Sequence, residues 1–176
     1  MAAPELRYRD RAELPRLGAA MPKGPVLLDT NVFINALGGR GPPHLRALLA
    51  SLPLALVSGP VVAELHWTRG RLDPGDPRTA SVLALYEEAL SQIAPAKILL
   101  PDEADWPRAG RLAGTAARAV AGPTRSPGNA ADRAELIHDA VTALAALRAG
   151  ATVVTADSDF DLFMQLEPEL EVLFYG

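Results

Sequence analysis

Acidic residues follow two short apolar runs of this sequence, at the points where the runs end. Asp29 comes directly after Val26-Leu27-Leu28, and Asp157 stands two residues beyond the run 152–155. Short runs of apolar and β-branched residues, such as Val26-Leu27-Leu28 and Thr152-Val153-Val154-Thr155, predict strands that are buried on both faces. Because ligands of open α/β sheets bind at the carboxyl ends of the strands, both acids stand where chemistry is expected.

Two further acids lie in segments with helical spacing. Glu64 falls in a helix expected to begin at Ser58-Gly59-Pro60, and it borders the apolar side of that helix. Asp139 lies on the flank of the strongest predicted helix, 133–149, beside small side chains that let another segment approach. Glu135 shares this flank one turn earlier and competes for any role given to Asp139.

Each of these acids also has a simpler interpretation. Asp29 can be only the N-cap of a helix expected over 32–37, and Glu64 and Asp139 can be solvated helix acids. His138 is interpreted as a packed or capping residue rather than a metal ligand. The chemical interpretation therefore depends on a fold that brings the acids together.

A convergent cluster of carboxylates indicates a bound cation. Like charges raise one another's pKa, so several close carboxylates stay ionised together only when a cation compensates them. Mg²⁺ or Mn²⁺ is the natural choice, because these ions prefer oxygen ligands, and a bound divalent ion lets an acidic site accept a phosphate. The chemistry indicated is phosphodiester hydrolysis by metal-activated water.

The elements that must position the acids alternate between strands and helices. Strands are expected at 26–28, 54–57, 97–100, 152–155 and 172–175. Helices are expected at 32–37, 43–52, from 60 onward, 79–94, 102–120 with a break near Pro107, 133–149 and through 163–164, with polar loops at 69–77 and 122–128. This alternation predicts βαβ units, and hence an α/β fold with three α/β/α layers around a central parallel sheet of about five strands.

Length and composition narrow the class of protein. The 176 residues indicate one globular domain, placed at 25–176, after an N-terminal extension, 1–24, that is either frayed or folded onto the surface and shows no chemistry of its own. The absence of cysteine excludes disulfides and thiolate metal sites. No secretory signal or membrane span is visible, so a soluble cytoplasmic protein is expected.

Basic residues offer only weak candidates for RNA contact. The net charge of −4 argues against a chain that is basic everywhere. Arg111 and Arg118 project from nearly the same side of the helix 102–120, and Arg125 lies in the loop 122–128. These arginines can contact a phosphate backbone, although a solvated basic face is the commoner explanation.

Four stretches together resemble the motifs of the PIN-domain ribonucleases, and among them the VapC toxins of bacterial toxin–antitoxin pairs. They are 26–34, 58–65, Asp139-Ala140-Val141 and 155–160. Their order and spacing agree with the family, and the resemblance covers the chain from Pro25 to its C-terminus.

The resemblance implies roles for named residues. It implies a divalent metal held by Asp29, Glu64, Asp139 and Asp157, with Asp159 as a further acid that completes the pocket. It also implies that Thr30, Asn31 and Thr155 orient these acids through hydrogen bonds. The sheet order of the family would place the strand ending at Asp29 beside the strand ending at Asp157, at the switch point of the sheet.

The resemblance also implies partners. VapC-like proteins cleave RNA, often transfer or ribosomal RNA, usually form homodimers, and are blocked by a partner antitoxin. The extension and the loops at 69–77 and 122–128 depart from the compact toxin pattern. A PIN nuclease of RNA processing or quality control, and a PIN-like binding module without catalysis, therefore stay open as alternatives. A phosphatase or receiver domain is disfavoured, because no second aspartate stands two residues after Asp29.

Overall fold

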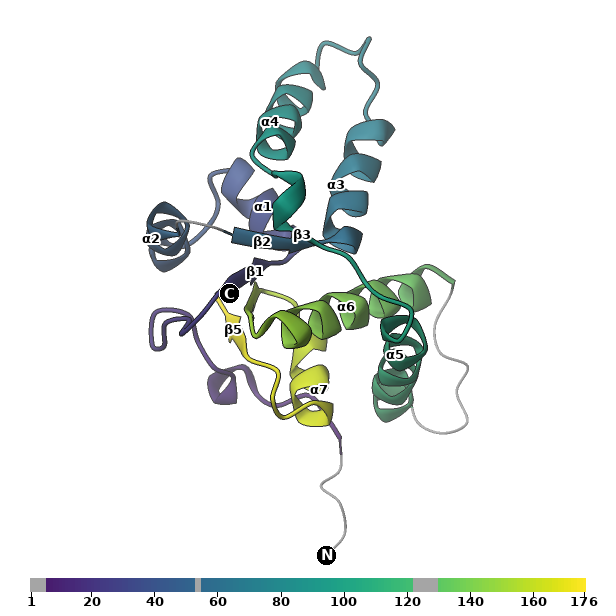
Figure 1. Ribbon diagram of the computed structural model, residues 1–176. Helices are drawn as coiled ribbons and strands as arrows, with labels where there is room; N and C mark the ends of the chain where they lie inside the picture. Colours follow the sequence, from purple (N-terminus) through teal and green to yellow (C-terminus); the bar gives the residue numbers. More distant parts are fainter. Residues whose placement is uncertain (1–5, 53–54, 122–129) are drawn as a thin grey trace, which may run out of the picture.

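The computed structural model describes residues 6–52, 55–121 and 130–176, which are built around a five-stranded parallel sheet (Figure 1). The strands are β1 (Val26–Leu28), β2 (Ala55–Ser58), β3 (Ile98–Leu99), β4 (Thr152–Thr155) and β5 (Val172–Phe174). Their spatial order is β3-β2-β1-β4-β5, and every neighbouring pair is parallel. The order reverses between β1 and β4, so the predicted pairing of these two strands at the switch point is confirmed.

Helices cover both faces of the sheet. They are α1 (Thr30–Leu37), α2 (Pro43–Ser51), α3 (Gly59–Arg71), α4 (Ala80–Ser91), α5 (Asp105–Ala121), α6 (Ala130–Ala149) and α7 (Asp159–Leu166), with short 3₁₀ helices η1 (Arg11–Glu13) and η2 (Pro95–Lys97). Successive strand residues point to opposite faces. Leu27 packs with α5, α6 and α7, whereas Val26 and Leu28 pack with α1 and α2. The predicted three-layer α/β/α architecture is confirmed.

Two helices differ from the prediction. The loop expected from Arg69 begins only at Leu72, because α3 continues to Arg71, whose guanidinium stacks on Trp67 with 4.8 Å to the ring centroid. The break expected near Pro107 is absent, since α5 begins at Asp105 and Pro107 falls in its first turn. Proline is tolerated there because the backbone N–H groups of the first turn have no intrahelical partner.

Some sequence predictions fall outside the described residues. They are the loop at 122–128, Arg125 within it, and Leu54 at the start of the predicted second strand. Within the described ranges, no helix combines the length and the apolar composition that crossing a bilayer requires.

The segment before β1 is folded against the domain. The N–H of Leu17 donates to the carbonyl of Phe174 at 2.9 Å, and the N–H of Phe174 donates to the carbonyl of Pro15 at 2.9 Å. Leu14 and Leu17 are buried. Residues 15–17 therefore run alongside β5 and cover its outer edge.

Candidate active site

Asp29 is held at the switch point by two side chains and one backbone group. It is the N-cap of α1, and its Oδ1 accepts the N–H of Thr30 at 2.7 Å. Its Oδ2 accepts the Asn31 amide at 2.5 Å and the Thr155 hydroxyl at 2.6 Å. Burial still raises the pKa of Asp29 to about 6, with Asp157 adding to the rise and these hydrogen bonds opposing it. Asp29 is thus an N-cap and also a fixed, buried acid.

Glu64 faces Asp29 from α3. The hydroxyl of Thr30 donates to Glu64 Oε2 at 2.5 Å, and Nδ1 of His138 lies 3.4 Å from Glu64 Oε1. Glu64 is half-buried, and His138 packs beside it rather than pointing into the core. The contact between His138 and Glu64 has no local signal in the sequence, because the two residues lie on different helices, α6 and α3.

Asp139 enters the site from α6. It is buried, and its Oδ2 has no hydrogen-bond partner within the described residues. Burial, followed by the charges of Asp29 and Asp157, raises the pKa of Asp139 to about 9. A buried carboxylate oxygen without a partner is costly, so this atom needs a ligand that the described residues do not supply.

The loop after β4 brings two more acids. Asp157 is half-buried, and its Oδ1 accepts the N–H of Asp159 at 2.9 Å. Burial raises the pKa of Asp157, and Asp159 and Glu64 add to the rise. Glu135 also faces the group, since burial and the charge of Asp157 are the main causes of its raised pKa. Glu135 is exposed whereas Asp139 is buried, and their competition for a role in the site stays a prediction.

The fold therefore gathers five acids that the sequence singled out, which we call the acidic cluster: Asp29, Glu64, Asp139, Asp157 and Asp159. Within the described part of the chain, none of the five forms an ion pair with lysine or arginine. Burial is the main cause of the raised pKa values of Asp29, Asp139 and Asp157, and the charges of the neighbouring carboxylates add to the rise.

The cluster fits a divalent cation in its donor atoms and its charge. Every donor is a carboxylate oxygen, which suits Mg²⁺ or Mn²⁺, and Oδ2 of Asp139 is an unpartnered buried ligand atom. Among the described residues, however, no three acidic or histidine side chains lie close enough together to coordinate one ion.

The predicted arginines lie apart from the cluster. Arg111 and Arg118 are exposed on α5, and in the described structure neither side chain bonds to a cluster residue. Arg125 falls outside the described residues. Contact of these arginines with RNA stays a prediction.

Comparison with known protein families identifies the fold. The family model described as "PIN domain" matches residues 26–163, which include β1, α6 and the whole acidic cluster. The chain belongs to the PIN-domain family. PIN domains are generally nucleases that depend on divalent metal ions, and the donor set of the cluster agrees with this chemistry. No curated protein sequence matches the chain significantly.

Solved PIN-domain structures share the fold at low sequence identity. The VapBC2 complex of Rickettsia felis bound to a DNA fragment from its promoter matches with a TM-score of 0.52 and 17% identity, over 87% of this chain and 100% of that chain. FitAcB from Neisseria gonorrhoeae matches with a TM-score of 0.56 and 24% identity, over 84% of this chain and 96% of that chain. VapBC-1 from nontypeable Haemophilus influenzae matches with a TM-score of 0.56 and 21% identity, over 86% of this chain and 98% of that chain.

Proposed function

We propose that this PIN-domain protein is a Mg²⁺- or Mn²⁺-dependent endoribonuclease and the toxin of a toxin–antitoxin pair. The observation that carries the proposal is the acidic cluster, which no lysine or arginine of the described residues compensates, with the buried Oδ2 of Asp139 as an orphaned ligand atom. The fold shared with VapBC and FitAB complexes supports the toxin role.

In this proposal Asp29, Glu64, Asp139, Asp157 and Asp159 hold the metal. When bound, the metal would activate water for attack on a phosphodiester bond and neutralise the phosphate charge. The protein's own groups orient the acids: Asn31 and Thr155 fix Asp29, and Thr30 ties Glu64 to α1. These hydrogen bonds restrict the carboxylates before any ion arrives, which lowers the cost of ordering them.

Exposed apolar side chains support a protein partner. Ile34 on α1, Trp67 on α3, and Val82 and Leu85 on α4 are all exposed. The three helices contact one another, so these side chains lie on neighbouring elements. Large apolar side chains gathered at a surface mark protein interaction sites. We propose that the antitoxin binds to this surface. We also propose that the toxin forms a homodimer and acts on transfer or ribosomal RNA in the cytoplasm.

The decisive experiment is cleavage of total transfer RNA and ribosomal RNA by the purified chain in Mg²⁺ or Mn²⁺. Asp139→Asn is expected to reduce cleavage by at least about 100-fold, because even residues that only orient metal ligands cost 10–100-fold when changed. Asp73→Asn, an exposed loop acid, is the matched control and should leave cleavage unchanged. EDTA should abolish cleavage by the wild type.

Further outcomes separate the alternatives. Growth arrest on expression of the chain alone, relieved by the product of a neighbouring short reading frame, supports the toxin role. Cleavage without growth arrest indicates a nuclease of RNA processing or quality control. Absence of both metal binding and cleavage would overturn the enzyme and leave a PIN-like binding module. Light scattering of the purified chain tests the homodimer.

A further inference from the structure

The N-terminal segment is fixed beside the acidic cluster by a buried ion pair. The N–H of Arg9 donates to Asp161 Oδ2 at 2.7 Å, and its Nε donates to Asp161 Oδ1 at 2.6 Å. The side chain of Asp161 is only 1% exposed, whereas that of Arg9 is 33% exposed, so the pair joins a buried acid to a half-buried arginine. The amide of Gln165 also donates to the carbonyl of Arg7 at 2.8 Å. Residues 7–9 are therefore held on α7 in a defined position.

Tyr8 extends from this fixed segment to the acidic cluster. Its hydroxyl donates a hydrogen bond to Oδ1 of Asp159, while 41% of the residue remains exposed. Burial of the hydroxyl and the neighbouring acids raise the pKa of Tyr8, so the hydroxyl stays a donor. The other exposed aromatic residues in the described chain are Trp67 and Trp106, and neither forms a hydrogen bond with the cluster. Tyr8 is thus an accessible aromatic ring at the edge of the site.

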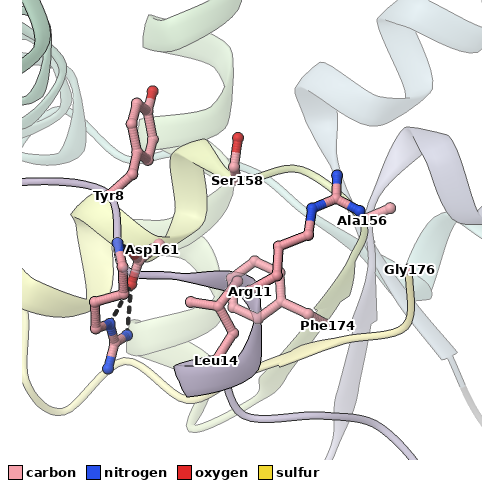
Figure 2. A pocket seen from close by; sticks show the side chains of 9 residues that line it. Tyr8, Arg11, Leu14, Ala156, Ser158, Asp161, Phe174 and Gly176 are labelled. Atoms are coloured by element: carbon pink, nitrogen blue, oxygen red, sulfur yellow. Dashed lines mark hydrogen bonds and ion pairs between the residues drawn. The ribbon is translucent and has the colours of Figure 1, made fainter.

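A small cavity beside Tyr8 carries hydrogen-bond donors. It has a volume of about 40 Å³, room for roughly three waters, and Figure 2 shows Tyr8, Ser158 and Arg11 with their polar ends on the same side of it. Within the described residues, the guanidinium of Arg11 and the hydroxyl of Ser158 have no side-chain partner. Asp161 also lines the cavity, but Arg9 pairs with it, so the unpaired guanidinium of Arg11 leaves the side chains around the cavity with a net positive charge.

We propose that Tyr8, Arg11 and Ser158 form a subsite for the nucleotide that flanks the scissile phosphodiester of a single-stranded RNA. The base stacks on the ring of Tyr8, and its phosphate binds Arg11 and Ser158 in the cavity. An RNA strand leaving the acidic cluster needs positive charge and an aromatic surface, and this segment supplies both. Single strands are required because bases within a duplex cannot stack on a side chain.

The subsite rests on the proposed function and is tested by two separate readouts. The first is the affinity for a short fluorescein-labelled single-stranded RNA, measured by anisotropy in Ca²⁺; the second is the rate of RNA cleavage in Mg²⁺. Tyr8→Ala is expected to weaken binding about tenfold, the typical cost of losing one base–aromatic stack. Tyr8→Phe keeps the ring and should lose far less. Arg11→Ala should weaken binding and make it less sensitive to salt.

Arg78→Ala is the matched control for Arg11→Ala, because Arg78 is an exposed arginine in the loop between α3 and α4, where it pairs with Asp76. Equal losses of RNA affinity in Arg11→Ala and Arg78→Ala would show that only the overall charge of the protein matters. That result would overturn the subsite. Equal losses of RNA affinity in Tyr8→Phe and Tyr8→Ala would show that Tyr8 acts through its hydrogen bond to Asp159 and not by stacking on a base. That result would also overturn the subsite.

The two readouts distinguish the two proposals. RNA binding that depends on Tyr8 and Arg11, without cleavage by the wild type, would support the subsite and overturn the nuclease. Cleavage by the wild type that is unaffected in Tyr8→Ala and Arg11→Ala would support the nuclease and overturn the subsite. Thermal unfolding of each variant shows whether the segment stays folded, and Tyr8→Phe provides the comparison if Tyr8→Ala unfolds.

Discussion

Replacing Asp139 by asparagine is expected to stabilise the metal-free protein. Asp139 is 9% exposed, and its pKa rises from 3.8 to about 9. A carboxyl whose pKa is higher in the folded state than in the unfolded chain binds its proton more tightly in the folded state, so its protonation favours folding. Its contribution is therefore complete below about pH 3.8 and is lost as the pH rises towards about 9.

The size of the effect follows from these values. At pH 7 the carboxyl is protonated in the folded state and ionised in the unfolded chain. This pH is about three units above the unfolded pKa of 3.8, and each unit is worth about 1.4 kcal/mol, so keeping the proton costs the fold about 4 kcal/mol at most. Asparagine removes this cost but buries an amide N–H without a partner, which costs about 1–3 kcal/mol. The net gain is about 1–3 kcal/mol, or roughly 2–10 °C in Tm.

Thermal unfolding of the wild type and Asp139→Asn, followed by circular dichroism in EDTA, measures this gain. The two proteins should unfold at similar temperatures at about pH 5 and diverge at about pH 8. Mn²⁺ should then raise the Tm of the wild type by more than that of the variant, because the variant lacks one of the five proposed ligands. The reasoning would be refuted if the variant were less stable than the wild type by the same amount at both pH values and if Mn²⁺ raised the Tm of both proteins equally.

Three further substitutions test the surroundings of the site. Thr155→Val removes the hydroxyl that donates to Asp29, so we expect a loss of about 1–3 kcal/mol in urea unfolding and a pKa of Asp29 above its value of about 6; an unchanged pKa in an NMR titration would contradict this. Arg9→Ala leaves Asp161 buried without its cation and should cost about 3 kcal/mol in urea unfolding, whereas a loss near zero would show that water replaces the guanidinium. Gly150→Ala should cost about 1 kcal/mol, since the φ of Gly150 is +58° and nothing lies within 4 Å of an added Cβ; calorimetry that finds no loss would show that the end of α6 adapts.

Much of the fold could be predicted because its signals are local. Apolar runs of three or four residues bounded by polar ones indicated the buried strands of a parallel sheet. The pairing of β1 with β4 needed the family resemblance, since strand order has no local signal. Once that order was given, the proximity of Asp29 to the loop holding Asp157 followed, and so did the contact with Thr155.

The contacts that could not be predicted join segments far apart in the chain. The N-terminal segment alternates arginines with acids and has no apolar period, so it is typical of a solvated tail. Nothing local shows that Arg9 pairs with the buried Asp161 or that Tyr8 reaches Asp159. The degree of burial of Asp139 was also unpredictable, because α6 is buried on almost every side over 139–146, whereas the sequence pattern indicated one apolar stripe.

The segment that covers β5 also limits how copies of this protein can associate through their sheets. A parallel sheet with two free edges can add strands from other molecules at either end. Residues 15–17 already occupy the hydrogen-bonding edge of β5 through Phe174, which leaves β3, only Ile98–Leu99, as the open edge among the described strands. Removing the segment would expose the backbone groups of β5 together with the apolar surface under Leu14 and Leu17, and self-association by strand addition would then begin at that edge.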